Sequence, residues 1–158
     1  MKQQEIRVRP VTPADAEAVV ALWRRVFPEY ADPSRPQRDP VASVARKLAF
    51  GDGLFWLAER GGELLGTAMA GYDGHRGWLY SVGVAPEARG AGLGRRLVAE
   101  AERALAALGC PKVNLQLLEG NEAGRRFWAR LGYAEDRVVS LGKRLGEASP
   151  SGPDGTKG

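Results

Sequence analysis

The sequence of 158 residues contains only one cysteine, one histidine and two methionines. A single thiol, Cys110, excludes an internal disulfide and a zinc site built from several thiolates, and it agrees with a reducing compartment. No apolar run approaches the roughly 18 residues that a membrane-spanning helix needs. The N-terminal stretch MKQQEIRVRP also lacks the apolar core of a secretion signal. These absences predict a cytoplasmic protein with no metal centre and no membrane association.

The charge balance is mildly basic, with a formal net charge of +4 and a pI near 9.5. Such an excess favours an anionic ligand without requiring a nucleic acid. An aromatic and basic strand platform is missing, as is any docking motif, so we expect at most a weak, salt-dependent affinity for nucleic acids. Hydrophobic residues make up 44% and charged residues 27%, which is ordinary for a globular protein.

Strand-like and helix-like segments alternate along the chain. Apolar patterns predict strands over residues 5–11, 54–60, 63–72, 76–84 and 112–118, and near 137–145. Helical patterns cover residues 13–27, 41–50, the stretch from the glycine-rich turn to about 108, and about 121–131. Thr12 and Asp15 form a capping box for the first helix, and the proline-rich segment 28–40 is typical of a loop. The mixture predicts one α/β domain over residues 1–145 and a disordered tail over 146–158.

A basic, glycine-rich turn follows the strand that ends at Val84, in the stretch VAPEARGAGLGRRL. Free N–H groups at the start of the next helix, with glycines that permit close approach, favour a phosphate ligand. A Walker A loop is excluded because Gly94 is followed by two arginines. The dinucleotide spacing G-x-G-x-x-G is also absent. The pattern that remains is Arg-x-x-Gly-x-Gly, from Arg89 through Gly92 to Gly94, and its alternative is a turn that only joins strand to helix.

With Val82, Val84 and Pro86 upstream, this turn resembles the pyrophosphate loop of the GNAT superfamily of N-acetyltransferases, which bind acetyl-coenzyme A (acetyl-CoA). The stretch NEAGRRFWARLGY resembles the last core helix of the superfamily, and the order of elements over residues 6–145 is similar too. The resemblance implies a mixed, mostly antiparallel sheet, splayed at the cofactor and flanked by about four helices. The stretches GYDGHRG, GCPKVNLQ and LGYAEDRVVSLGKRL resemble the bacterial YpeA-like acetyltransferases.

The resemblance also implies roles for residues of the motif strand and the turn. The backbone from Val82 to Val84 would pair with the pantetheine arm, and the amides from Gly90 to Arg95 would hold the pyrophosphate. Arg89, Arg95 and Arg96 would add positive charge, and a solvated helix face is their alternative. Asn121 matches a position that contacts pantetheine, and it equally suits the N-cap of its helix. The expected cofactor-binding set is Val82, Gly83, Val84, Arg89, Gly90, Ala91, Gly92, Leu93, Gly94, Arg95, Asn121 and Trp128.

Two residues that the superfamily often uses for proton transfer are replaced in this chain. An acceptor amine must be neutral to attack a thioester, because an ammonium has no lone pair. The resemblance places Trp128 at the usual tyrosine acid and Gln116 at the glutamate base, and an indole cannot protonate a thiolate. The candidate substitutes, each with an alternative as a core, loop or surface residue, are Glu119, Tyr80, Tyr133 and His75. We expect positioning of the thioester to carry most of the catalysis.

These observations predict an N-acetyltransferase that moves an acetyl group to a primary amine of a small molecule or peptide in a direct ternary complex. No motif indicates a covalent intermediate, and Cys110 is expected to serve packing. The alternative is a non-catalytic module that binds or senses acetyl-CoA, which Gln116 and Trp128 favour. The acceptor is unidentified, and its ammonium could be attracted by acids of the first loop: Glu29, Asp32 and Asp39. An exposed final strand would suit a homodimer.

Overall fold

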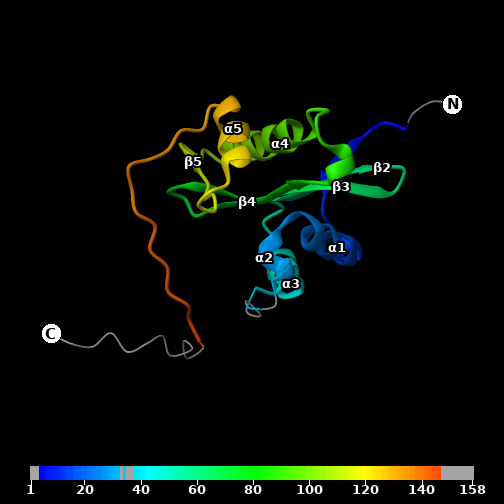
Figure 1. The fold of residues 1–158 in the computed structure, drawn as a ribbon, viewed down its shortest axis with the longest axis horizontal. Helices are drawn as coiled ribbons and strands as arrows, with labels where there is room; N and C mark the ends of the chain where they lie inside the picture. Colours follow the sequence, from blue (N-terminus) through cyan, green and yellow to red (C-terminus); the bar gives the residue numbers. More distant parts are fainter. Residues whose placement is uncertain (1–3, 33, 35–37, 147–158) are drawn as a thin grey trace. The chain divides into compact units, whose positions relative to one another are not determined.

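The computed structural model describes residues 4–32, 34 and 38–146 and has a mixed α/β fold (Figure 1). The chain forms two compact units, one up to Asn121 and the other from Glu122 on. Its elements within the described residues are β1 (Arg7–Pro10), η1 (Pro13–Asp15), α1 (Ala16–Val26), α2 (Pro28–Ala31), α3 (Pro40–Phe50), β2 (Phe55–Arg60), β3 (Glu63–Tyr72), β4 (Gly77–Val84), η2 (Pro86–Ala88), α4 (Leu93–Ala107), β5 (Val113–Asn114) and α5 (Glu122–Arg130). None of the described helices is long and apolar enough to cross a membrane.

The sheet of the first unit has the strand order β1-β2-β3-β4-β5, and all its pairings are antiparallel except the last. Two glycines, Gly61 and Gly62, form the turn between β2 and β3, as the sequence predicts. The parallel pairing of β4 with β5 involves only Gly77 with Val113 and Trp78 with Asn114. Beyond Trp78, the remaining length of β4 has no strand partner on that side among the described residues, which confirms the expected splay.

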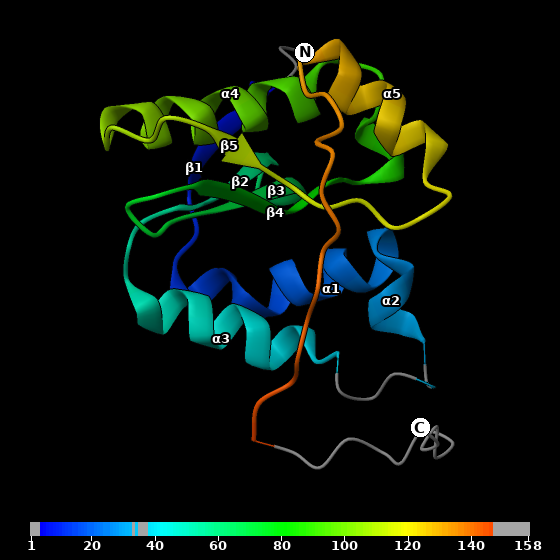
Figure 2. The ribbon, with the colours of Figure 1, turned by 90° about the vertical axis from the view of Figure 1, so that its left-hand side faces the viewer.

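Helices cover both faces of this sheet (Figure 2). On one face, α4 buries an apolar stripe of Leu93, Leu97, Val98, Ala101 and Leu105. On the other face, α1 and α3 pack on the strands around a cluster of Val11, Val19, Val20, Trp23, Val44, Phe55, Leu57 and Met69. Burial of these stripes at helical spacing holds each helix against the sheet, since apolar area removed from water is the main driving force.

The entry into α1 is fixed by a partly buried cluster of charges. The Asp15 carboxylate accepts hydrogen bonds from the Thr12 N–H at 2.7 Å and the Thr12 hydroxyl at 2.9 Å, which confirms the predicted capping role of Asp15. Arg9 donates to both Asp15 oxygens at 2.8 Å, and also to Glu59 on β2. The Arg9 hydrogen bonds hold the pKa of Asp15 far below its usual range. The cluster therefore joins β1, β2 and the start of α1.

Three predicted elements differ from the structure. The segment 28–40 is not all loop, because Pro28 starts the short helix α2. Tyr30 on this helix stacks on Trp23, with 5.6 Å between the ring centroids. Residues 33 and 35–37 of this segment lie outside the described residues. The strand expected over 112–118 is reduced to β5, because the side chains that follow pack poorly: Leu117 is 37% exposed and Leu118 53%.

The strand predicted near 137–145 is wrong, since the described residues after α5 contain no strand. Four apolar side chains that should cover a sheet are exposed instead: Val138, Val139, Leu141 and Leu145. A strand needs a hydrogen-bonded neighbour, and the described part of the second unit offers only a helix. The tail predicted from residue 146 lies outside the described residues except for Gly146.

Candidate functional site

The strand β4 carries a β-bulge in its second half. Thr67 on β3 pairs with Gly83, and Met69 pairs with Tyr80, so β4 has one residue more than β3 between these two pairs. Ser81 lies in this extra length and has a φ of +48°, a left-handed value that non-glycine residues rarely adopt. Val82 also lies in the bulge, and Gly83 and Val84 follow it; along residues 82–84 the edge toward β5 has no strand partner. Backbone groups along this edge can therefore bond to an extended ligand.

Gly83 and Gly66 permit the sheet to pack closely at this point. A Cβ atom built on Gly83 would lie 2.8 Å from Cζ of Phe27, on the side of α1. A Cβ atom on Gly66 would lie 2.9 Å from the Gly83 carbonyl oxygen and 3.0 Å from Cδ1 of Leu97, on the side of α4. A larger side chain at Gly83 would therefore collide with residues at the end of α1, and one at Gly66 would collide with β4 and with α4.

The glycine-rich turn connects β4 to α4 through η2. Gly90 and Gly92 have left-handed φ values of +86° and +79°, and a Cβ atom built on either would meet no atom within 4 Å. α4 begins at Leu93, and the Arg96 N–H makes its first helical hydrogen bond to the Gly92 carbonyl at 3.1 Å. The N–H groups of the first helical turn have no partner inside the helix and carry partial positive charge. Gly90, Ala91 and Gly92 are exposed, so the chain just before this helix start is open to solvent, and a helix start of this kind can bind a phosphate or pyrophosphate.

Two of the motif arginines also support the backbone. Arg89 donates from Nε to the Val84 carbonyl at 3.0 Å and so closes the turn against the end of β4. Arg96 donates from Nη1 to the Ile6 carbonyl at 2.9 Å, next to the start of β1. Arg95 lies between them in sequence on the exposed side of α4. The predicted cofactor-binding residues from Val82 to Arg95 therefore form one continuous strand, turn and helix start.

The candidate catalytic residues of the first unit occupy different positions. Tyr80 lies on β4 just before the bulge, is 48% exposed and stacks on Trp78 at 6.4 Å with an interplanar angle of 18°. Burial, and to a lesser extent the charge of Asp73, raises the pKa of the Tyr80 phenol. His75 is exposed in the turn between β3 and β4, and Glu119 is exposed in the turn after β5. Of these three, Tyr80 alone lies on the strand that carries the bulge.

The remaining candidates lie at the unit boundary and beyond it. Asn121 directly precedes α5, and its N–H donates to the Leu118 carbonyl at 3.2 Å. Trp128 is buried on α5 and meets the ring of Tyr133 edge-on at 5.1 Å. Trp128 and Tyr133 therefore support each other within the second unit. Cys110 packs beside Gly77, where a built Cβ atom would lie 2.6 Å from its sulfur, in keeping with the expected packing role.

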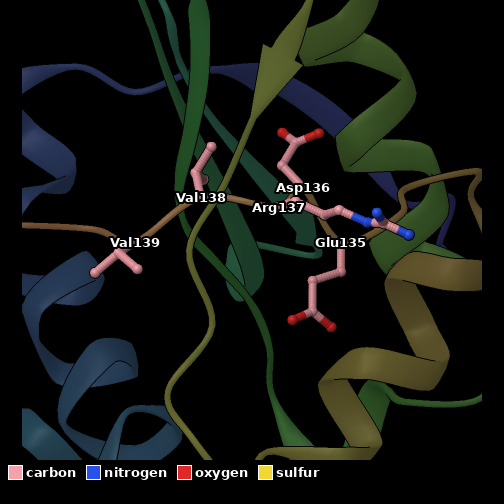
Figure 3. Close-up of a pocket in the computed structure, with 5 residues that line it drawn as sticks. All are labelled: Glu135, Asp136, Arg137, Val138 and Val139. Atoms are coloured by element: carbon pink, nitrogen blue, oxygen red, sulfur yellow. The ribbon is translucent and has the colours of Figure 1, made fainter.

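Two surface hollows contain no residue of the glycine-rich turn in their lining. The first, of about 530 Å³, is lined by five consecutive residues, Glu135 to Val139. Figure 3 shows Glu135 and Asp136 pointing to opposite sides of the extended chain, so their side chains do not converge on a ligand. The second, of about 320 Å³, lies between α1 and α3 and is mostly apolar. None of the predicted site residues lines either hollow.

The acids predicted to attract an acceptor have local partners in two cases. Asp39 accepts a hydrogen bond from the Val41 N–H at 2.9 Å and caps α3. Asp32 accepts from the N–H and the hydroxyl of Ser34. Glu29 lies on α2 and is half-buried.

Thr67 and Ser81 were not predicted from the sequence, because no local pattern indicates a bulge that depends on a neighbouring strand.

Comparison with known proteins identifies the same family that the glycine-rich turn indicates. The Acetyltransferase (GNAT) family matches residues 17–133. The fold is similar to that of the PaiA N-acetyltransferase from Thermoplasma acidophilum in complex with coenzyme A, with a TM-score of 0.75 and 18% identity over 85% of this chain and 93% of that one. It is also similar to aminoglycoside N-acetyltransferase AAC(6')-Iy in complex with CoA, with a TM-score of 0.73 and 21% identity over 91% and 98%.

A third similar structure is the ribosomal-protein-S18-alanine N-acetyltransferase from Escherichia coli, with a TM-score of 0.69 and 18% identity over 84% of this chain and 79% of that one. At these identities the three structures establish the fold, whereas the family match covers most of the sequence itself. On that match, the chain belongs to the Acetyltransferase (GNAT) family.

Proposed function

We propose that this protein is an N-acetyltransferase that transfers the acetyl group of acetyl-CoA to a primary amine in a direct ternary complex. The observation that carries the proposal is the turn before α4, with its two left-handed glycines and the empty space where their Cβ atoms would be. Such a turn accepts a pyrophosphate at the helix N-terminus. Coenzyme A is bound in two of the similar structures, PaiA and AAC(6')-Iy, which supports acetyl-CoA as the co-substrate here.

The strand β4 would guide the rest of the co-substrate. With the pyrophosphate at the turn, the pantetheine arm would run along the unpaired edge from Val84 back toward Tyr80, a span of about 13 Å at strand geometry. Its amides would then bond to backbone groups of residues 82–84, which have no strand partner on that side. The acetyl thioester that the co-substrate supplies would therefore lie close to the bulge and to Tyr80.

Proton transfer at this position favours Tyr80 as the acid for the departing thiolate. A phenol with a raised pKa is protonated at neutral pH, so it can donate to a sulfur anion and cannot act as the base. The ammonium is expected to lose one proton to solvent before the amine attacks the thioester. The second proton that the nitrogen gives up as the amide forms would reach the Tyr80 phenolate through solvent and restore the phenol. His75 and Glu119 are exposed and are assigned no proton transfer.

A second candidate function, binding or sensing of acetyl-CoA without transfer, is favoured by Gln116 and Trp128, at the two positions where the resemblance places the base and the acid that the superfamily often uses. The two functions differ in turnover. Release of coenzyme A thiol, followed with a thiol reagent across a panel of primary amines, would support transfer. Tight binding without amine-dependent release across the panel would favour the sensor.

The binding step is tested by calorimetric titration of acetyl-CoA into three proteins: the parent, Gly92→Glu and Gly109→Glu. Both variants place the same side chain at a left-handed glycine with no neighbour within 4 Å, at φ +79° and +83° respectively. They therefore share the backbone strain, but Gly109 follows the far end of α4, about 22 Å from Gly92 for a 15-residue helix. Loss of binding in Gly92→Glu alone supports the proposal. Equal binding by all three proteins would show that the turn is not part of the binding site.

Several finer expectations belong to the same proposal. The acceptor is a primary amine of a small molecule or peptide, and the YpeA-like stretches suggest the corresponding bacterial subgroup. A cytoplasmic location and a homodimer complete the proposal, and cell fractionation and light scattering would test them.

A further inference from the structure

Thr67 is the only polar residue in the buried core of the described residues, with no exposed surface. It lies on β3, two residues from Met69 of the apolar cluster under α1. A hydroxyl without hydrogen bonds is costly at such a position. The Thr67 hydroxyl makes two: it lies 3.0 Å from Nε1 of Trp23 and 2.9 Å from the carbonyl oxygen of Ser81.

The direction of both hydrogen bonds is fixed by chemistry. An indole N–H can only donate, so the Thr67 oxygen accepts from Trp23. A hydroxyl has one proton, and it is then directed to the Ser81 carbonyl, which can only accept. Trp23 is itself fully buried and stacks on Tyr30, so its ring has little freedom to turn away. The three residues form a directed chain from the core of α1 to the backbone of β4.

This chain ends on the bulge of β4. Ser81 is the only non-glycine residue with a positive φ among the described residues, and it stands in the extra length between the Tyr80 and Gly83 pairs. An unusual backbone conformation persists only where its surroundings hold it. The Thr67 hydroxyl supplies such a hold from the side of the core.

We propose that Trp23 and Thr67 are positioning residues which, through the Ser81 carbonyl, hold the β4 bulge in the shape that presents residues 82–84 to the co-substrate. The inference rests on the proposed function, since it assumes that acetyl-CoA lies along this edge. It adds two residues that do not touch the co-substrate and act through the backbone of β4.

The test compares acetyl-CoA affinity in Thr67→Val and Thr67→Ser. Valine keeps the branched shape and the strand preference but leaves the Trp23 N–H and the Ser81 carbonyl without their partner. Serine keeps the hydroxyl. Val44→Ala serves as the control for general destabilisation, because Val44 is buried in the same cluster on α3 and takes no part in the hydrogen bonds of the chain. Calorimetry is run at a temperature where circular dichroism shows all variants folded.

We expect Thr67→Val to bind acetyl-CoA at least about tenfold more weakly, the equivalent of one lost buried hydrogen bond. Thr67→Ser and Val44→Ala should bind within about twofold of the parent on the same scale. Equal affinity in Thr67→Val and the parent would overturn the inference and leave the proposed function intact. Weakening by Val44→Ala to the same extent would also overturn it, because the effect would then be one of stability.

Hydrogen exchange in the absence of ligand separates the two proposals. Faster exchange confined to the amides of residues 81–84 in Thr67→Val, and absent in Thr67→Ser, would show that the hydroxyl holds the bulge. Unchanged or uniformly faster exchange would overturn the inference whether or not acetyl-CoA binds. If the parent protein fails to bind acetyl-CoA, the proposed function fails, and with it the purpose assigned to the bulge.

Discussion

The close packing of β3 against β4 makes Gly66 the most informative single position for the fold of the site. Its replacement by alanine places a Cβ atom 2.9 Å from the carbonyl oxygen of Gly83 and 3.0 Å from Cδ1 of Leu97. The first contact is with backbone, which cannot turn aside as a side chain can. The second is with a fully buried leucine. Gly66→Ala must therefore move β4 at the residues proposed to meet the co-substrate.

The expected size follows from two opposing effects. Overpacking of a close-packed interior costs about 1–3 kcal/mol. Replacing a strand glycine by alanine returns roughly 0.5–1 kcal/mol through the lower entropy of the unfolded chain. The net loss for Gly66→Ala should be about 1–2 kcal/mol, which lowers the melting temperature by about 3–6 °C for a chain of this size.

Gly71 provides a control on the same strand. A Cβ atom there would lie 3.8 Å from Cε2 of Tyr80, an ordinary contact, and the residue has no positive φ. Gly71→Ala should therefore be neutral or stabilise the protein by up to about 1 kcal/mol. Urea unfolding followed by circular dichroism measures both variants. Equal stabilities for Gly66→Ala and Gly71→Ala would refute the packing argument.

Three further predictions concern charge, backbone strain and chemistry. Asp15→Asn should lower the unfolding free energy at pH 7 by about 1–3 kcal/mol, because Arg9 and Thr12 lose a charged acceptor. The pKa of Asp15 is lower in the folded than in the unfolded chain, so its contribution is present above about pH 4 and is lost as the pH falls further toward the folded value. Urea titrations should thus show a weaker acid dependence in Asp15→Asn, and an identical dependence would count against the Arg9 cluster. Ser81→Gly should stay within about 1 kcal/mol of the parent, whereas Ser81→Val, a β-branched residue at positive φ, should cost about 2 kcal/mol. The same unfolding assay measures both variants. An unchanged unfolding free energy in Ser81→Val would argue against the left-handed conformation in the bulge. Tyr80→Phe should lower kcat for amine-dependent thiol release by about 10²-fold at unchanged acetyl-CoA affinity, and an undiminished kcat would remove Tyr80 as the acid.

Features encoded by neighbouring residues were predictable from the sequence. The cap of Asp15 on the first helix, the Gly61–Gly62 turn and the start of α4 after Gly92 each depend on a few consecutive side chains. The strand, turn and helix start formed by residues 82–95, which we propose as the cofactor site, were predictable for the same reason, since they follow one another directly. Their arrangement in space is local, and local conformational preference suffices to specify it.

Features that depend on distant partners were not predictable in this way. The bulge at Ser81 exists because of the register of β3, and its support by Trp23 and Thr67 spans 44 residues. The apolar alternation after residue 137 predicts a strand, but a strand forms only where a neighbour accepts its hydrogen bonds. The short β5 is a further case, since residues 115–118 have strand-like composition but do not belong to any strand.

We propose that acetyl-CoA lies along the second half of β4 with its pyrophosphate at the turn before α4. A nitrogen–proton correlation spectrum recorded during titration with acetyl-CoA would locate the ligand residue by residue, because each backbone amide reports its own environment. We expect the largest shifts at the amides of residues 82–84 and 90–95, with small shifts in α3 and β1. Shifts concentrated at residues 135–139, or none at the turn, would contradict it.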